Sequence, residues 1–117
     1  MKLRECYTEM HGDYEDVMTR LPREASVIRF LRRFAENTEF EELKKAAADR
    51  DYRRVFELSH DLKGIAANLS ITRFGGLIGE ICEKTRNREP GADFADMLQW
   101  AEEEYQTVLQ AIGKLED

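Results

Sequence analysis

The sequence has few of the residues from which disulfide frameworks and metal sites are built. It contains two cysteines and two histidines in 117 residues. Cys6 and Cys82 are far apart and show neither CxxC nor His-paired spacing, so neither a zinc motif nor a disulfide framework is indicated. His11 lies in the turn "MHGD", where we expect an ordinary loop residue rather than a ligand. The chain is therefore expected to hold no metal and to work in a reducing compartment.

Long apolar runs and an excess of basic residues are also missing. The N-terminal stretch "MKLRECYTEM" lacks the apolar centre of a signal peptide, and no run elsewhere is long enough to span a bilayer. The net charge of −6 opposes binding to nucleic acid or to an anionic membrane, because both need a basic surface. We expect a cytoplasmic protein that binds neither nucleic acid nor membrane.

Nucleotide-binding motifs are absent as well. No G-x-x-x-x-G-K-[ST] motif occurs, and Gly75, Gly76 and Gly79 lack the preceding strand and the spacing of a phosphate-binding loop. We expect these glycines to let helices approach closely or to leave space beside a functional surface. The chain length and the missing motifs argue against an ATP-dependent histidine kinase. Whether the protein is an enzyme in another sense stays open.

Helical periodicity is the main pattern that is present. Apolar residues recur at three- and four-residue steps almost throughout, and Pro and Gly occur mainly where the pattern restarts. The pattern predicts an all-α single domain over residues 1–117. Two short helices within residues 1–21 are expected to pack across one end of an antiparallel four-helix bundle, residues 22–117. The expected helix starts are Pro22 in a first turn, a Thr38–Glu41 capping box, Ser70 or Thr72, and Asp93.

The segment "FELSHDLKGIAANLS", residues 56–70, has unusual residues on one face of a predicted helix, about residues 51–69. An interior glycine in a helix costs roughly 1 kcal/mol relative to alanine. With Leu62 at the centre of the core face, His60 projects about 160° away from it. The neighbours of His60 on this outer face are Arg53, Phe56, Lys63, Gly64 and Ala67.

This outer face suits reversible phosphorylation. A ring nitrogen of His60 is a nucleophile, the ammonium group of Lys63 can pair with phosphoryl oxygens, and the absent side chain at Gly64 leaves room for the group. The predicted partner-binding residues are Arg53, Phe56, Ala67 and Ile71. For Phe56, packing against a neighbouring helix is an equally open alternative.

The stretch "SHDLKGIAANLS" resembles the H-x-L-K-G-x-x-x-N-L signature of histidine-containing phosphotransfer (HPt) domains. The preceding "FEELKKAAADRDYRRVFEL" and the order and length of the helices extend the resemblance over essentially the whole chain. It implies a phosphorelay intermediate that takes a phosphoryl group from an aspartate of one receiver domain and passes it to another. His60 would be phosphorylated at Nε2, Lys63 would stabilise the phosphoryl charge, and Gly64 would keep the site open. Asp61 replaces the small or hydroxyl residue usual in the family, and we expect a modest effect.

The resemblance also implies the partners, which are receiver domains of response regulators or hybrid histidine kinases. The receiver would supply Mg²⁺ and an acidic pocket, so this chain would need no cofactor of its own. Arg53 and Lys63 would face that acidic partner, with a smaller contribution from Arg54. We expect a monomer. The alternative is a helical adaptor that binds signalling partners with the same face and is not phosphorylated.

Overall fold

The structure is a computed structural model that describes residues 1–116, and it confirms an all-α fold. No strand occurs in this part of the chain, which forms seven helices. In chain order they are α1 (Leu3–Glu9), α2 (Tyr14–Arg20), α3 (Glu24–Glu36), α4 (Glu39–Ala48), α5 (Tyr52–Asn68), α6 (Thr72–Thr85) and α7 (Phe94–Gly113). Asp117, the last residue of the predicted domain, lies outside the described residues.

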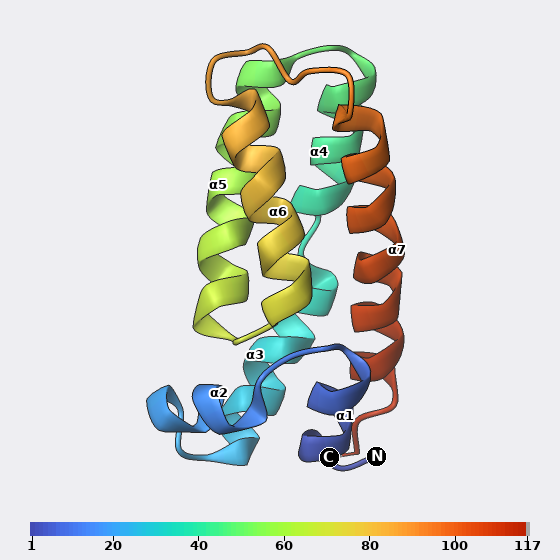
Figure 1. Ribbon diagram of the computed structural model, residues 1–117. Coiled ribbons are helices and arrows are strands. Elements are labelled where there is room, and N and C mark those ends of the chain that lie inside the picture. The colour runs from blue at the N-terminus through green and yellow to red at the C-terminus, as the bar shows by residue number, and fades with distance from the viewer. Residues whose placement is uncertain (117) are drawn as a thin grey trace.

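The longer helices run side by side in an elongated molecule of 41 × 23 × 20 Å (Figure 1). Helices α3 and α4 follow one another along one side. Helix α4 packs against α5, α5 against α6, and both α6 and α3 against α7. Helices α1 and α2 lie at one end, where α1 packs against α2 and α7. The two short helices therefore lie together at one end of the molecule.

An aromatic cluster joins four of these helices in the core. Phe34 of α3, Phe40 of α4, Phe74 of α6 and Tyr105 of α7 are all buried, and their ring centroids lie between 4.5 and 6.1 Å apart in the five contacting pairs. Such pairs contribute about 0.5–1.5 kcal/mol each beyond their buried area. The cluster therefore gives α3 and α4, which are separated by Asn37 and Thr38, a common core with α6 and α7.

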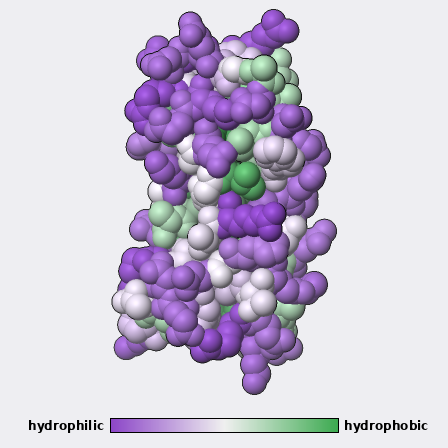
Figure 2. All heavy atoms as spheres, in the orientation of Figure 1, coloured by the Kyte–Doolittle hydropathy of each residue, from purple (hydrophilic) through white to green (hydrophobic). Residues whose placement is uncertain are grey.

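In contrast to the apolar core, the surface of the molecule is mostly polar. The face drawn in Figure 2 is mostly hydrophilic and is interrupted by small hydrophobic areas. Trp100 of α7, 53% exposed, is the one large apolar side chain that the described residues expose strongly. No helix among residues 1–116 has both the length and the apolar character needed to cross a membrane.

Two glycines of α6 face α5. A Cβ atom at Gly75 would lie 3.1 Å from Cβ of Ala66, which is tighter than an ordinary contact, so glycine favours the close approach of the two helices here. A Cβ atom at Gly79 would lie 3.8 Å from Cδ and Cε of Lys63, whose aliphatic stem therefore runs over this glycine. A Cβ atom at Gly76 would meet nothing within 4 Å. Gly75 thus fits the predicted role of letting two helices approach closely. Gly79 fits the predicted role of leaving space beside a functional surface, here for the stem of Lys63.

Several predicted helix starts are wrong in detail. Helix α3 begins at Glu24, so Pro22 precedes the helix instead of occupying its first turn. The Thr38–Glu41 capping box does not form, because Thr38 makes no side-chain cap and its hydroxyl donates to Glu42 at 3.3 Å. The side chain of Asn37 replaces it by accepting the N–H of Glu39 at 2.7 Å.

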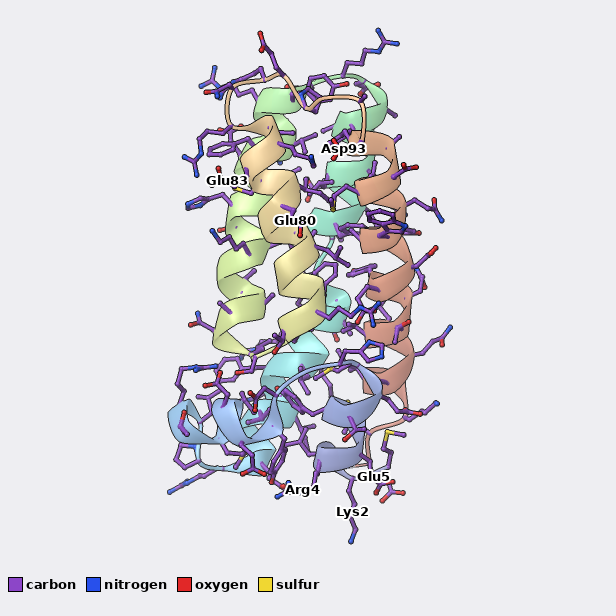
Figure 3. The ribbon with its side chains drawn as sticks, in the orientation of Figure 1. Lys2, Arg4, Glu5, Glu80, Glu83 and Asp93 are labelled. Carbon is purple, nitrogen blue, oxygen red and sulfur yellow. The ribbon has the colours of Figure 1, made fainter. Side chains whose placement is uncertain are left out.

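The predicted caps of α6 and α7 also differ. Ile71 is the N-cap residue of α6, and Ser70 instead turns its hydroxyl to the carboxylate of Asp16 at 2.7 Å. Asp93 does occupy the N-cap position of α7 (Figure 3), but its carboxylate binds Lys84 at 2.7 Å and caps nothing. In each case a partner distant in the chain outcompetes the local backbone for the polar side chain.

The N-terminal helices hold the C-terminal end of α5. Tyr7 of α1 donates its hydroxyl to the carbonyl of Leu69 at 2.7 Å. The guanidinium of Arg20 in α2 donates to the carbonyls of Ala67 at 3.0 Å and Asn68 at 3.3 Å. These carbonyls lie at the end of α5, where helical backbone acceptors run out of N–H partners. The carbonyl of Ala67 also accepts the N–H of Ser70 at 3.2 Å. The N-terminal segment therefore stabilises the helix that carries His60.

Candidate functional site

Helix α5 places His60 at mid-helix on the surface. The helix begins after Asp51, whose carboxylate accepts the N–H of Arg54 at 3.2 Å and so caps the first turn. Its buried face contains Val55, Leu58, Ser59, Leu62 and Ala66. His60 lies on the exposed side, as the helical projection predicts. The buried face fixes the rotation of the helix, and this rotation in turn points His60 outwards.

Lys63 and Gly64 share that outer face. Both are exposed, and the stem of Lys63 crosses Gly79 of α6. A Cβ atom at Gly64 would meet nothing within 4 Å, so no contact inside the described part of the protein requires glycine there. A packing explanation for Gly64 therefore fails, and its position one turn after His60 remains the distinctive feature.

Phe56 lies beside His60, and two arginine guanidinium groups stack near its ring. The ring centroids of Phe56 and His60 are 6.0 Å apart. The guanidinium carbons of Arg86 and Arg88 lie 5.4 and 5.8 Å from the centroid of the Phe56 ring. Phe56 is half-buried, so its ring packs against neighbouring side chains and is also partly exposed at the surface. The stacking places two more cations at the edge of the His60 face.

The sequence pattern does not single out Arg86 or Arg88. Arg86 is the C-cap residue of α6, and Arg88 follows two residues later. Helix α6 runs antiparallel to α5, so its C-terminal end brings both arginines to Phe56 in the N-terminal half of α5 (Figure 1). The guanidinium of Arg88 is anchored by donating to the carbonyl of Arg86 at 2.6 Å. Both arginines reach the His60 face only because α5 and α6 pack in antiparallel orientation.

The carboxylate of Glu83 neutralises part of the positive charge of these cations. Arg86 forms an ion pair with Glu83 at 2.8 Å, and this guanidinium, with a smaller effect from Lys63, lowers the pKa of Glu83. Figure 3 shows Glu83 on α6, near α5. Lys63, Arg86 and Arg88 thus bring three cations to this part of the surface, and Glu83 pairs with one of them.

The prediction that Ile71 lies on the partner-binding face is wrong. It is fully buried, whereas Arg53 and Ala67 are exposed on α5. The helix ends in a Schellman motif, in which Ser70 has φ 55° and the N–H of Ile71 donates to the carbonyl of Ala66 at 2.9 Å. The helical projection does not continue past such a turn, and the residue after it packs inwards.

Two charged neighbours on α5 turn away from His60 towards α4. Arg54 pairs with Glu42 at 3.4 Å. Asp61 lies close to Glu39, and this neighbouring carboxyl group adds to the effect of burial, which is the larger cause of the raised pKa of Glu39. Neither side chain therefore adds directly to the charge beside His60.

In comparisons with known proteins, no family model, no curated protein and no solved structure matches the chain. The chemistry of the site is therefore argued from its geometry. An exposed imidazole with an ammonium group on the same face and open space beside it can accept a small anionic group from a docked partner. In residues 1–116, no group of three or more His, Cys, Asp or Glu side chains is arranged to hold a metal ion.

Proposed function

We propose that the protein is a histidine phosphotransfer protein of a two-component phosphorelay. His60 accepts a phosphoryl group from the aspartate of one receiver domain and passes it to the aspartate of another. The observation that carries the proposal is the combination on α5 of an exposed His60, Lys63 on the same face, and an open position at Gly64. The resemblance of "SHDLKGIAANLS" to the HPt signature supports the same function.

The reaction is an in-line transfer between nitrogen and oxygen. The Nε2 lone pair of His60 attacks phosphorus, the P–O bond to the receiver aspartate breaks, and the electron pair of that bond returns to the carboxylate. The reverse step delivers the group to the second receiver. Because such transfers depend mainly on positioning and charge neutralisation, Lys63 is sufficient as a charge-stabilising group from this chain, and the receiver supplies Mg²⁺.

The surface around His60 suits an acidic partner. Arg53, Lys63, Arg86 and Arg88 provide positive charge, and Phe56 and Ala67 provide apolar contact area. Complementary charge of this kind favours fast and correctly oriented association. The proposal includes an HPt-like antiparallel four-helix bundle, in which α3 and α4 together form one of the four columns, and a monomeric, cytoplasmic protein.

The test is phosphoryl transfer from a receiver domain that carries labelled phosphate. The wild-type protein should acquire acid-labile label, and His60→Gln should acquire none from the receiver. Lack of transfer to the wild type, or equal transfer to His60→Gln, would refute the proposal. If the receiver instead binds both proteins equally tightly without transfer, the alternative of a non-phosphorylated helical adaptor is correct.

A further inference from the structure

A groove between α6 and α7 carries an exposed tryptophan. Trp100 of α7 is 53% exposed and lines a groove of about 500 Å³ between the two helices. An exposed indole gives up the large favourable free energy of burying its ring, and tryptophan is enriched at protein interfaces for this reason. None of the residues that line the groove belongs to α5. The groove is therefore a surface separate from the one that carries His60.

The antiparallel packing of α6 and α7 determines which residues meet in the groove. Nε of Arg73 on α6 lies 3.7 Å from Glu104 on α7. Counting along the two helices in opposite directions from this contact places Leu77 level with Trp100. Glu80 then lies one turn beyond Leu77 on α6 (Figure 3). The exposed indole is thus flanked by a half-buried apolar side chain and by a carboxylate, and all three line the groove.

Gly76 leaves space in the groove beside this indole. It lies one turn before Glu80 on α6 and also lines the groove. A Cβ atom at Gly76 would meet nothing within 4 Å, and its backbone does not have the left-handed conformation that favours glycine. Neither packing nor backbone conformation therefore requires glycine here, and the space that a side chain would fill is open to a partner.

The groove carries an excess of negative charge. Its charged lining residues are Arg73, Glu80, Glu103 and Glu104. Glu104 pairs with Arg73 and is also held by His11. Glu80 and Glu103 are exposed, and neither carboxylate forms an ion pair or a hydrogen bond with another group of residues 1–116. Two carboxylates, one from each helix, therefore remain to attract a cation to the indole.

This combination suits a guanidinium group on an extended segment. A guanidinium is planar, so it can stack on the indole of Trp100 while its N–H groups donate to a carboxylate such as that of Glu80. An ammonium group is a compact point charge and cannot do both equally well. The helix rise gives about 10 Å between the levels of Arg73 and Glu80. This length matches about three residues of an extended chain.

We propose that the groove between α6 and α7 is a docking site for an arginine-containing segment of a partner protein. The guanidinium group stacks on Trp100 and donates to Glu80, and the carboxylate of Glu103 adds to the attraction from α7. The aliphatic part of the arginine side chain lies against Leu77 and in the space at Gly76. The charge of the groove selects a basic partner, whereas the His60 face suits an acidic one.

The test uses the full-length chain and a short capped peptide of alanine and arginine. Trp100 is the only tryptophan of the chain, so its fluorescence and its indole N–H resonance report on the groove alone. Both should change on titration, with a dissociation constant of about 1 mM or lower. The same peptide with citrulline in place of arginine, which is neutral and similar in shape, should change neither. No change with the arginine peptide, or an equal change with the citrulline peptide, would overturn the proposal.

Variants of the groove test the assignment of its residues. Glu80→Gln, Trp100→Leu and Gly76→Gln should each weaken peptide binding several-fold, as measured by ¹H–¹⁵N NMR titration. Glu57→Gln, which removes the same charge at an exposed position of α5, is the matched control and should leave the affinity unchanged. Circular dichroism verifies that all variants are folded. Unchanged affinity in folded Glu80→Gln and Trp100→Leu would overturn the proposal.

Two further measurements distinguish other occupants of the groove. Free argininamide should bind more weakly than the peptide, and equal affinity would identify a small-molecule site instead. The indole resonance of Trp100 should not depend on the concentration of the chain alone, and a shift on concentration would identify a second copy as the occupant. Either result would overturn the proposal. Neither His60 nor a receiver takes part, so the outcome is independent of the proposed function.

Discussion

Substitutions at Gly64 should have opposite effects on stability and on the proposed function. The residue lies inside α5, is exposed, and does not have the left-handed backbone that favours glycine. A Cβ atom there would meet nothing within 4 Å. The structure thus contains no packing or backbone reason for glycine, and substitution should release the cost that glycine imposes on a helix interior.

The magnitude follows from helix propensity alone. Gly64→Ala and Gly64→Gln should each raise the free energy of unfolding by about 0.5–1 kcal/mol. For a domain of this size, 1 kcal/mol corresponds to about 4 °C in Tm. Under the proposed function, transfer of phosphate from a receiver to His60 should slow at the same time. The slowing should be greater for Gln than for Ala, because the longer side chain lies one turn from the imidazole.

Gly76 is the matched control. It is also exposed and helical, a Cβ atom there would also meet nothing within 4 Å, and it lies on α6. Gly76→Ala and Gly76→Gln should stabilise the protein equally and leave transfer unchanged. Gly75→Ala should gain less stability or lose some, because its Cβ atom would lie 3.1 Å from Ala66.

Two measurements decide the outcome. Urea denaturation gives the free energy of unfolding of each variant, and single-turnover labelling from a loaded receiver gives the transfer rate. Unchanged or reduced stability of Gly64→Ala would refute the argument from helix propensity. Equal transfer rates for Gly64→Gln and Gly76→Gln would refute the steric role of Gly64 beside His60, whatever the stabilities are.

Three further predictions follow from other contacts. Lys63→Ala should slow receiver-to-His60 transfer without lowering stability, and exposed Lys45→Ala on α4 should not change transfer; equal rates in the two variants would contradict a charge-stabilising role. Tyr7→Phe should lower the free energy of unfolding in urea by about 1–3 kcal/mol, because the buried carbonyl of Leu69 loses its donor; a change near zero would show that water replaces it. Burial raises the pKa of Cys6 from 9.0 to about 11, so the folded state disfavours the thiolate, and stability should fall as pH rises from 9 towards 11. Cys6→Ala should reduce this fall, and an identical pH profile in the variant would refute the assignment.

The orientation of His60 could be predicted from sequence because it depends on one helix. The apolar residues around Leu62 determine which side of α5 is buried, and the opposite side is then exposed whichever element packs against the first. Gly64 and Lys63 follow from the same rotation. The all-α class and the short N-terminal helices were predictable for the same reason, since periodicity within each segment is a local property.

The errors arise where a residue has a choice between local and distant partners. A threonine, serine or aspartate before a helix can cap it, but Ser70 and Asp93 instead bind Asp16 and Lys84, which packing brings close. Ile71 was placed by extending a helix past its end, although the left-handed Ser70 had already turned the chain. Arg86 and Arg88 reach Phe56 only through the antiparallel register of α5 and α6.

The two histidines differ in the same way, because one has a local environment and the other has distant partners. The environment of His60 is made largely by residues within one turn of it on α5, so the sequence alone was sufficient to select it. The environment of His11 is made by Glu104, which lies 93 positions away, and by Arg73 at the start of another helix. No local pattern separates His11 from an ordinary loop histidine. A histidine that is held by a distant carboxylate is therefore visible only once the fold has brought the two side chains together.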